Sequence, residues 1–156
     1  LGQTQELADR FAARFNMAMD VQLRPFPRAE EVVAKLKARG IKLALVTNGA
    51  AEGQREKIVR FNLARHFDHI QIEGEAGFGK PDARAYHHAM DALGVASHET
   101  WMVGDNLVWE VEAPQRLGIF AVWHDHLGAG LPDDTPVKPD LIVRDLSELL
   151  DALALS

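Results

Sequence analysis

Two hydrophobic periods alternate along the chain. Apolar residues spaced three or four positions apart indicate helices that bury one face, whereas short continuous apolar runs indicate strands that are buried on both faces. Helices are predicted at residues 5–19, 29–39, 53–65, 81–93 and 146–153, with a shorter one ending at 117, and strands at 41–46, 69–72, 100–103, 119–123 and 141–143. Because strands alternate with helices, the pattern predicts an α/β fold, a Rossmann-like doubly wound parallel sheet of about five strands.

Proline and glycine mark the boundaries of these elements. Pro25 and Pro27 separate the first predicted helix from the second, and Gly40 is typical of the residue that ends a helix. Pro114 predicts a kink in the helix that ends at residue 117. Residues 124–139 are rich in Gly, Pro and Asp, and we expect them to form a surface loop.

Length and composition narrow the class of protein. A chain of 156 residues with 47% apolar and 26% charged residues is the size and make-up of one globular domain. The net charge of -6, without a basic run, argues against nucleic acid and anionic membranes as partners, and no apolar run reaches the ~18 residues of a membrane span. The absence of cysteine excludes disulfides, thiolate metal sites and a cysteine nucleophile. We therefore expect a cytoplasmic protein that binds a small molecule.

Ligands of doubly wound sheets bind at the carboxyl ends of the strands, so the residues after each strand are candidates for function. The first strand is followed by Thr47, Asn48 and Gly49, whose hydroxyl, amide and backbone N–H groups can bind an anion. A helix cap with a turn glycine explains the same residues without a ligand. After the second strand, a glycine-rich loop delivers Lys80, which suits a phosphate oxygen or a neighbouring carboxylate. The alternative is a solvated surface lysine.

Two acidic residues follow the third strand. Asp105 leaves the strand end, and Glu110 falls in the first turn of the next helix, so both can face one hard cation. Mg²⁺ prefers oxygen ligands, and one or two carboxylates with waters and a substrate phosphate satisfy it. The alternative is that Asp105 caps the helix and Glu110 complements its dipole. A second metal hint, the triplet of residues 124–126 (HDH), lacks a third ligand, and we expect its histidines to be solvent-exposed.

Together, TNG after one strand, GKPD after the next and GDNxxxE after a third resemble the motifs of the haloacid dehalogenase superfamily of hydrolases, most of which are Mg²⁺-dependent phosphatases. The resemblance covers nearly the whole chain. It implies that Thr47, Asn48 and Gly49 bind the phosphoryl group, that Lys80 steadies the nucleophile and phosphate, and that Asp105 binds Mg²⁺. Glu110 stands where the family more often has aspartate, and we expect it to be the second acidic group of the metal site.

The family's first motif, a strand that ends in DxDx(T/V) and carries the nucleophile, has no counterpart in the sequence. The helix at 5–19 resembles the last part of a cap that follows this strand in relatives, so residues 1–24 are interpreted as a cap remnant and 25–156 as the core. In the family the missing strand lies between the strands that carry TNG and GDN. Its absence would leave two unpaired edges in the middle of the sheet, to be filled by direct pairing, another chain or further residues.

Two functional hypotheses follow from the sequence. The first is a phosphatase that acts on a small phosphomonoester through Mg²⁺ and an aspartyl-phosphate, inactive in this chain because covalent transfer needs the absent nucleophile. The second is a truncated, non-catalytic α/β module that binds a ligand or associates with itself. In that case, the exposed central strand edges predict a homodimer.

Overall fold

The computed structural model describes residues 24–154. The predicted helix at 5–19 and nearly all of the proposed cap remnant therefore lie outside the described residues. The helical elements are α2 (Ala29–Ala38), α3 (Ala51–Arg60), η1 (Leu63–His66), α4 (Glu73–Ala76), α5 (Ala83–Leu93), η2 (Ser97–Glu99), η3 (Leu107–Glu112), α6 (Ala113–Gln115) and α7 (Glu148–Ala152). The strands are β1 (Ala44–Thr47), β2 (His69–Ile72), β3 (Trp101–Gly104), β4 (Phe120–His124) and β5 (Leu141–Val143). The predicted α/β fold is confirmed.

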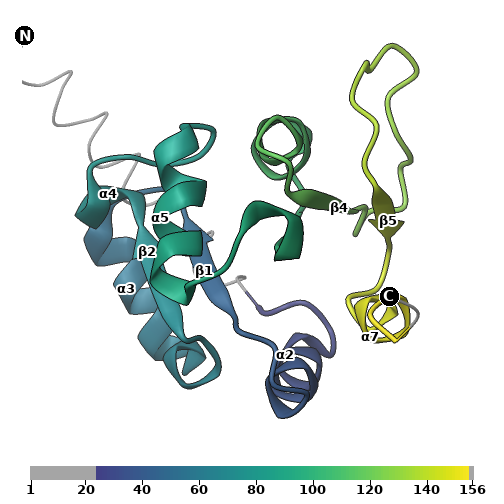
Figure 1. Ribbon diagram of the computed structural model, residues 1–156. Coiled ribbons are helices and arrows are strands. Elements are labelled where there is room, and N and C mark those ends of the chain that lie inside the picture. The colour runs from purple at the N-terminus through teal and green to yellow at the C-terminus, as the bar shows by residue number, and fades with distance from the viewer. Residues whose placement is uncertain (1–23, 155–156) are drawn as a thin grey trace, which may run out of the picture.

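The five strands form two parallel sheets. One contains β1 and β2, and the other has the order β3-β4-β5. Figure 1 shows β1 and β2 with α3, α4 and α5 in one half of the molecule, and β4 and β5 with α7 in the other. In the described part of the chain β1 does not pair with β3, so the predicted break between the TNG and GDN strands is confirmed, and direct pairing does not fill it.

The inner edges of β1 and β3 carry peptide groups that point away from their own sheets. Leu43 accepts a hydrogen bond from His69 N, and Thr100 accepts one from Phe120 N. Peptide groups alternate sides along a parallel strand, so Ala44 and Val46 of β1 face the break, as do residues 101 and 103 of β3. Every residue of these two strands is only half-buried, whereas β4 is buried from its second residue onward. The strands beside the break thus have the exposure of sheet edges.

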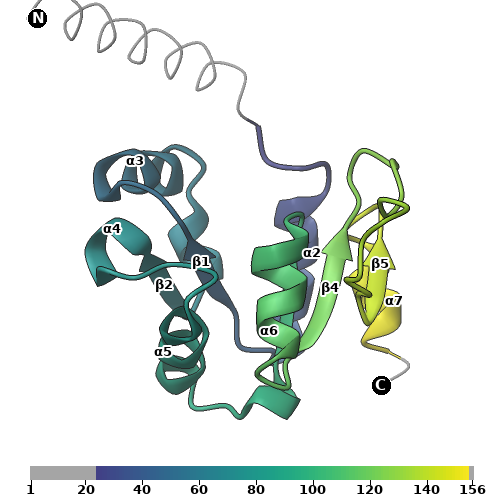
Figure 2. The same ribbon diagram turned by 90° about the horizontal axis from the view of Figure 1, so that it is seen from above.

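Helices cover both faces of the three-stranded sheet. On one face α2 and α7 pack on β4 and β5, in a core cluster made of Val32, Leu36, Val122, Val143, Leu149 and Leu150. On the other, α5 and α6 pack on β3 through a cluster built around Tyr86, Met90 and Ile119. Figure 2 shows the two sheets from above, with α5 beside β2 and α6 between the two halves. No helix between residues 24 and 154 is long and apolar enough to cross a membrane.

The structure departs from the predicted elements in several places. The helix predicted at 53–65 breaks into α3 and η1 because Asn62 adopts a left-handed conformation with φ of 49°, which an α-helix does not contain. The strand predicted from residue 41 begins only at Ala44, although the preceding residues still pack on the core. The loop after β2 contains the single-turn helix α4, which is too short to show a period in sequence.

Candidate functional site

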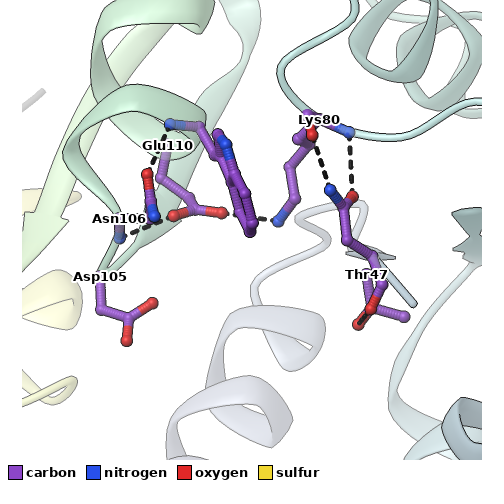
Figure 3. A pocket seen from close by; sticks show the side chains of 7 residues that line it. Thr47, Lys80, Asp105, Asn106 and Glu110 are labelled. Atoms are coloured by element: carbon purple, nitrogen blue, oxygen red, sulfur yellow. Dashed lines mark hydrogen bonds and ion pairs between the residues drawn. The ribbon is translucent and has the colours of Figure 1, made fainter.

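A cavity of about 410 Å³ lies at the carboxyl ends of β1 and β3 (Figure 3). It is lined by Thr47, Asn48, Lys80, Asp105, Asn106, Trp109 and Glu110. Five of the six residues proposed from the sequence therefore converge, although they come from three separate strand-to-helix connections. Gly49 is the exception, since it is not among the residues that line the cavity. Asn106, which belongs to the GDN motif, and Trp109 also line the cavity, although neither is among these six residues.

The TNG segment is held in place by side chains from two neighbouring elements. The Thr47 hydroxyl donates to Gln54 Oε1 at 3.1 Å, and rotation about its C–O bond can redirect the proton into the cavity. The Gly49 N–H donates to Glu73 Oε2 at 2.9 Å, so a carboxylate of the same chain accepts from this group. The cap of α3 is Ala50 without a side-chain bond, which removes the helix-cap explanation of Thr47 and Asn48.

Asn48 clamps the peptide group of Lys80. Its Nδ2 donates to the Lys80 carbonyl at 2.6 Å, and its Oδ1 accepts from the Lys80 N–H at 2.9 Å. The Oδ1 and one of the two Nδ2 hydrogens are thus engaged with the Lys80 peptide, so Asn48 positions Lys80. Gly79 permits this approach, because a Cβ there would lie 2.7 Å from Asn48 Oδ1. The two hydrogen bonds between Asn48 and the Lys80 peptide therefore require glycine at position 79.

Lys80 and Glu110 form a buried ion pair across the break between the sheets. Nζ lies 2.7 Å from Oε1, and the two side chains are only 10% and 6% exposed. Lys80 is therefore not a solvated surface residue. The second carboxylate oxygen of Glu110 accepts the N–H of Asn106 at 2.7 Å, so both oxygens have a partner. A role for Glu110 as a direct metal ligand would require it to share an oxygen with the cation, whereas orienting Lys80 needs no rearrangement.

The GDN motif forms a tight turn that brings Glu110 back against the end of β3. Asn106 caps η3, since its Oδ1 accepts from the N–H groups of Val108 and Trp109, both at 3.0 Å. Asp105 is therefore not the cap. Glu110 lies directly over Gly104, where an added Cβ would overlap the Glu110 side chain and lie 2.7 Å from its Cδ. Only glycine at position 104 allows the carboxylate to reach Lys80.

Asp105 is the open acidic group of the site. Its side chain is 61% exposed, and His126 Nε2 lies 3.7 Å from its Oδ2. The backbone is fixed, because the Trp123 indole N–H donates to the Asp105 carbonyl at 2.9 Å. Asp105 thus has a backbone held in place and two carboxylate oxygens available to a cation or its waters. Within residues 24–154 no three His, Asp or Glu side chains converge as a ready-made metal site.

The HDH triplet differs from the expected exposed loop. His124 is the last residue of β4 and is 5% exposed, and burial lowers its pKa. Asp125 is 3% exposed and accepts the N–H groups of Ala129 and Gly130, so it organises the following turn. His126 remains partly exposed beside Asp105. The expectation of exposed histidines was wrong for His124, because the strand extends one residue further than its apolar run.

Known proteins resemble this chain in sequence and in fold. A phosphoserine phosphatase of Thermus thermophilus is 47% identical over 131 residues, covering 83% of this chain and 51% of that protein. A glyceraldehyde 3-phosphate phosphatase of Pyrococcus furiosus is 31% identical over 133 residues, covering 84% of this chain and 55% of that protein. The chain thus spans about half the length of the curated relatives it matches.

Solved structures agree with the sequence comparison. A HAD phosphatase of Thermococcus onnurineus superposes with a TM-score of 0.74 at 28% identity, over 82% of this chain and 57% of that one. A 2-haloacid dehalogenase of Pseudomonas syringae gives a TM-score of 0.74 at 28% identity, over 86% and 55% of the two chains. The family model of haloacid dehalogenase-like hydrolases matches residues 2–118, three quarters of the sequence. The chain therefore belongs to the haloacid dehalogenase-like hydrolase family.

Proposed function

We propose that the cavity binds the phosphoryl group of a small phosphomonoester together with Mg²⁺, as part of a phosphatase that acts through an aspartyl-phosphate. The observation that carries this proposal is the convergence of Thr47, Lys80, Asp105 and Glu110 on one cavity at the carboxyl ends of β1 and β3. The phosphoserine and glyceraldehyde 3-phosphate phosphatases among the relatives act on small phosphorylated compounds, which supports this substrate class.

Each residue has a role that its position allows. Thr47 donates its hydroxyl to a phosphoryl oxygen, and Lys80 supplies positive charge to the phosphoryl group while Glu110 fixes its ammonium. The donor set fits Mg²⁺, because Asp105 presents exposed hard oxygen ligands and the rest of an octahedral shell can come from waters and phosphate. When bound, Mg²⁺ neutralises charge on the transferring phosphoryl group.

The catalytic half of the proposal requires a nucleophile that this sequence does not place at the cavity. Among the lining residues only Asp105 and Glu110 carry carboxylates, and Glu110 is already bound on both oxygens. Asp105 is assigned to the metal. Binding without turnover is therefore the proposed activity of the chain by itself, and hydrolysis is the proposed activity of the site once a nucleophilic strand occupies the break between β1 and β3.

Binding is expected to depend on Asp105. Calorimetric titration of inorganic phosphate in the presence of Mg²⁺ is expected to show weak, millimolar binding that Asp105→Asn reduces about tenfold, since one metal ligand loses its charge. Asp134→Asn, in the loop after β4, removes the same charge away from the cavity and is the matched control. If the two substitutions weaken binding equally, Asp105 acts only through the net charge of the protein, and its assignment as a metal ligand is wrong.

The unpaired edges of β1 and β3 favour a second proposal, self-association. Peptide groups of Ala44, Val46 and residues 101 and 103 face the break, and edges of this kind pair with other chains. We expect sedimentation to show a concentration-dependent homodimer. Val46→Pro, which removes an N–H from the β1 edge, is expected to shift the chain toward monomer. A compact monomer at all concentrations would contradict this prediction.

Cytoplasmic location also stays a prediction.

A further inference from the structure

Tyr86 lies in α5 and contacts η3, the turn that carries Trp109 and Glu110. Its side chain is 4% exposed and packs with Met90 and Ile119. The hydroxyl donates to the backbone carbonyl of Trp109 at 2.5 Å. Trp109 lines the cavity and Glu110 follows it in the chain, so the hydrogen bond fixes the backbone immediately before the carboxylate that holds Lys80.

The carbonyl of Trp109 needs this partner because its own helix cannot supply one. Residues 107–112 form a π-helical turn, in which each carbonyl accepts from the N–H five residues on. The Ala113 N–H accordingly donates to the Val108 carbonyl. The next donor in the series would be residue 114, which is a buried proline without an N–H. Pro114 therefore leaves the Trp109 carbonyl unpaired within the helix, and a buried unpaired carbonyl is costly.

The Tyr86 bond also joins the two halves of the molecule. Tyr86 lies in α5, which directly follows the loop that carries Lys80, and Trp109 lies in η3, which follows β3. Lys80 and Glu110 link the same two segments on the cavity side at 2.7 Å. Burial raises the pKa of Tyr86, and the charge of Glu110 raises it further, so the hydroxyl remains a donor over the working pH range.

We propose that Tyr86 is a positioning residue of the site: its hydroxyl supplies the hydrogen bond that Pro114 withholds from the Trp109 carbonyl, and so fixes the turn that aims Glu110 at Lys80. Tyr86 is not among the residues that line the cavity. Its effect on the site passes through the backbone of Trp109. The role of Tyr86 in ligand binding rests on the proposed function. Its effect on the stability of the turn can be measured without a ligand.

The test is a pair of double-mutant cycles read by urea unfolding. Tyr86→Phe keeps the ring and is expected to raise the unfolding equilibrium constant about tenfold, because it leaves the Trp109 carbonyl unsatisfied and misaligns Glu110 with Lys80. In the background of Pro114→Ala, which restores an N–H at position 114, the same substitution is expected to cost at least threefold less. In the background of Lys80→Met it is also expected to cost at least threefold less, because the part of the cost that comes from the misaligned ion pair is absent there.

Met90→Leu is the control, since Met90 packs in the same cluster as Tyr86 and has no O–H or N–H group in its side chain. Its effect is expected to be the same in all three backgrounds. If the effect of Tyr86→Phe on unfolding is the same with and without Pro114→Ala, and the same with and without Lys80→Met, Tyr86 only supports the packing of the cluster. That result would overturn the proposal. If the Lys80→Met protein does not fold, the Pro114→Ala cycle decides alone.

Phosphate titration with Mg²⁺ then separates this proposal from the proposed function. If wild type binds phosphate, Tyr86→Phe is expected to weaken binding about fivefold and Tyr86→Phe/Pro114→Ala to recover part of it, as for a displaced charged group. If wild type binds no phosphate but the two cycles show coupling, the proposed function fails while the positioning role stands. Normal phosphate affinity in Tyr86→Phe would overturn the positioning role.

Discussion

The chain by itself is expected to release no measurable para-nitrophenol from para-nitrophenyl phosphate with Mg²⁺, whereas a chimera that supplies a nucleophilic strand is expected to be active. Covalent phosphoryl transfer requires an attacking group, and positioning together with charge stabilisation does not replace it. The chimera adds a strand that ends in DxDx(T/V), the first motif of the family, to the N-terminal side of residues 1–156. Its turnover is expected to exceed that of the chain alone by at least about a thousandfold, the scale of losing a nucleophile.

Two controls make the chimera informative. Changing the first aspartate of the supplied DxD motif to asparagine is expected to return turnover to background, and Asp105→Asn in the same chimera is expected to do nearly the same. Robust turnover by the unextended chain that Asp105→Asn abolishes would show that the chain already contains a sufficient nucleophile. An inactive chimera with native-like circular dichroism and cooperative unfolding would instead contradict the assignment of the cavity to phosphoryl transfer.

The spacing of apolar residues predicted the fold well, because buried strands give continuous apolar runs whereas amphipathic helices give apolar residues three or four positions apart. β2 and β5 were predicted to the residue, since each is an apolar run closed by polar or turn residues. The break between β1 and β3 came from the family resemblance alone, because apolar periodicity does not say which strands are neighbours. Local backbone choices were not predictable, and the left-handed Asn62 that ends α3 is one of them.

Convergence of the site was predictable because parallel strands present their carboxyl ends at one edge. The partners within the site were not, since hydrogen bonds between loops depend on tertiary packing. The amide of Asn48 binds the Lys80 peptide and the Gly49 N–H binds Glu73, and neither of these partners was predicted from the sequence. Tyr86 gave no sequence signal apart from its place on the buried face of a helix, although Pro114 was visible as a proline within a helix.

Breaking the Lys80–Glu110 pair is expected to give the largest loss of stability among single substitutions at the site. The two side chains are 10% and 6% exposed, so removing one charge leaves the other buried without its counterion. Lys80→Met is expected to lower the free energy of unfolding by about 3–5 kcal/mol, the usual cost of an uncompensated buried charge. Glu110→Gln leaves a buried ammonium and also weakens the bond from Asn106 N, so a loss of similar size is expected.

The double variant Lys80→Met/Glu110→Gln separates two contributions to the free energy of unfolding. One is the net stabilisation by the ion pair, and the other is the cost of a buried charge without its counterion. Without either charge, the free energy of unfolding measured in urea is expected to recover by about 1–3 kcal/mol relative to Lys80→Met alone, since buried ion pairs barely exceed their desolvation cost. Lys37→Met removes the exposed ion pair with Asp68 and is the matched control, with an expected change below about 1 kcal/mol. Equal losses from Lys80→Met and Lys37→Met would mean that water reaches the break between the sheets freely. The ion pair would then be a surface contact, and the rigid geometry assigned to Lys80 would lose its physical basis.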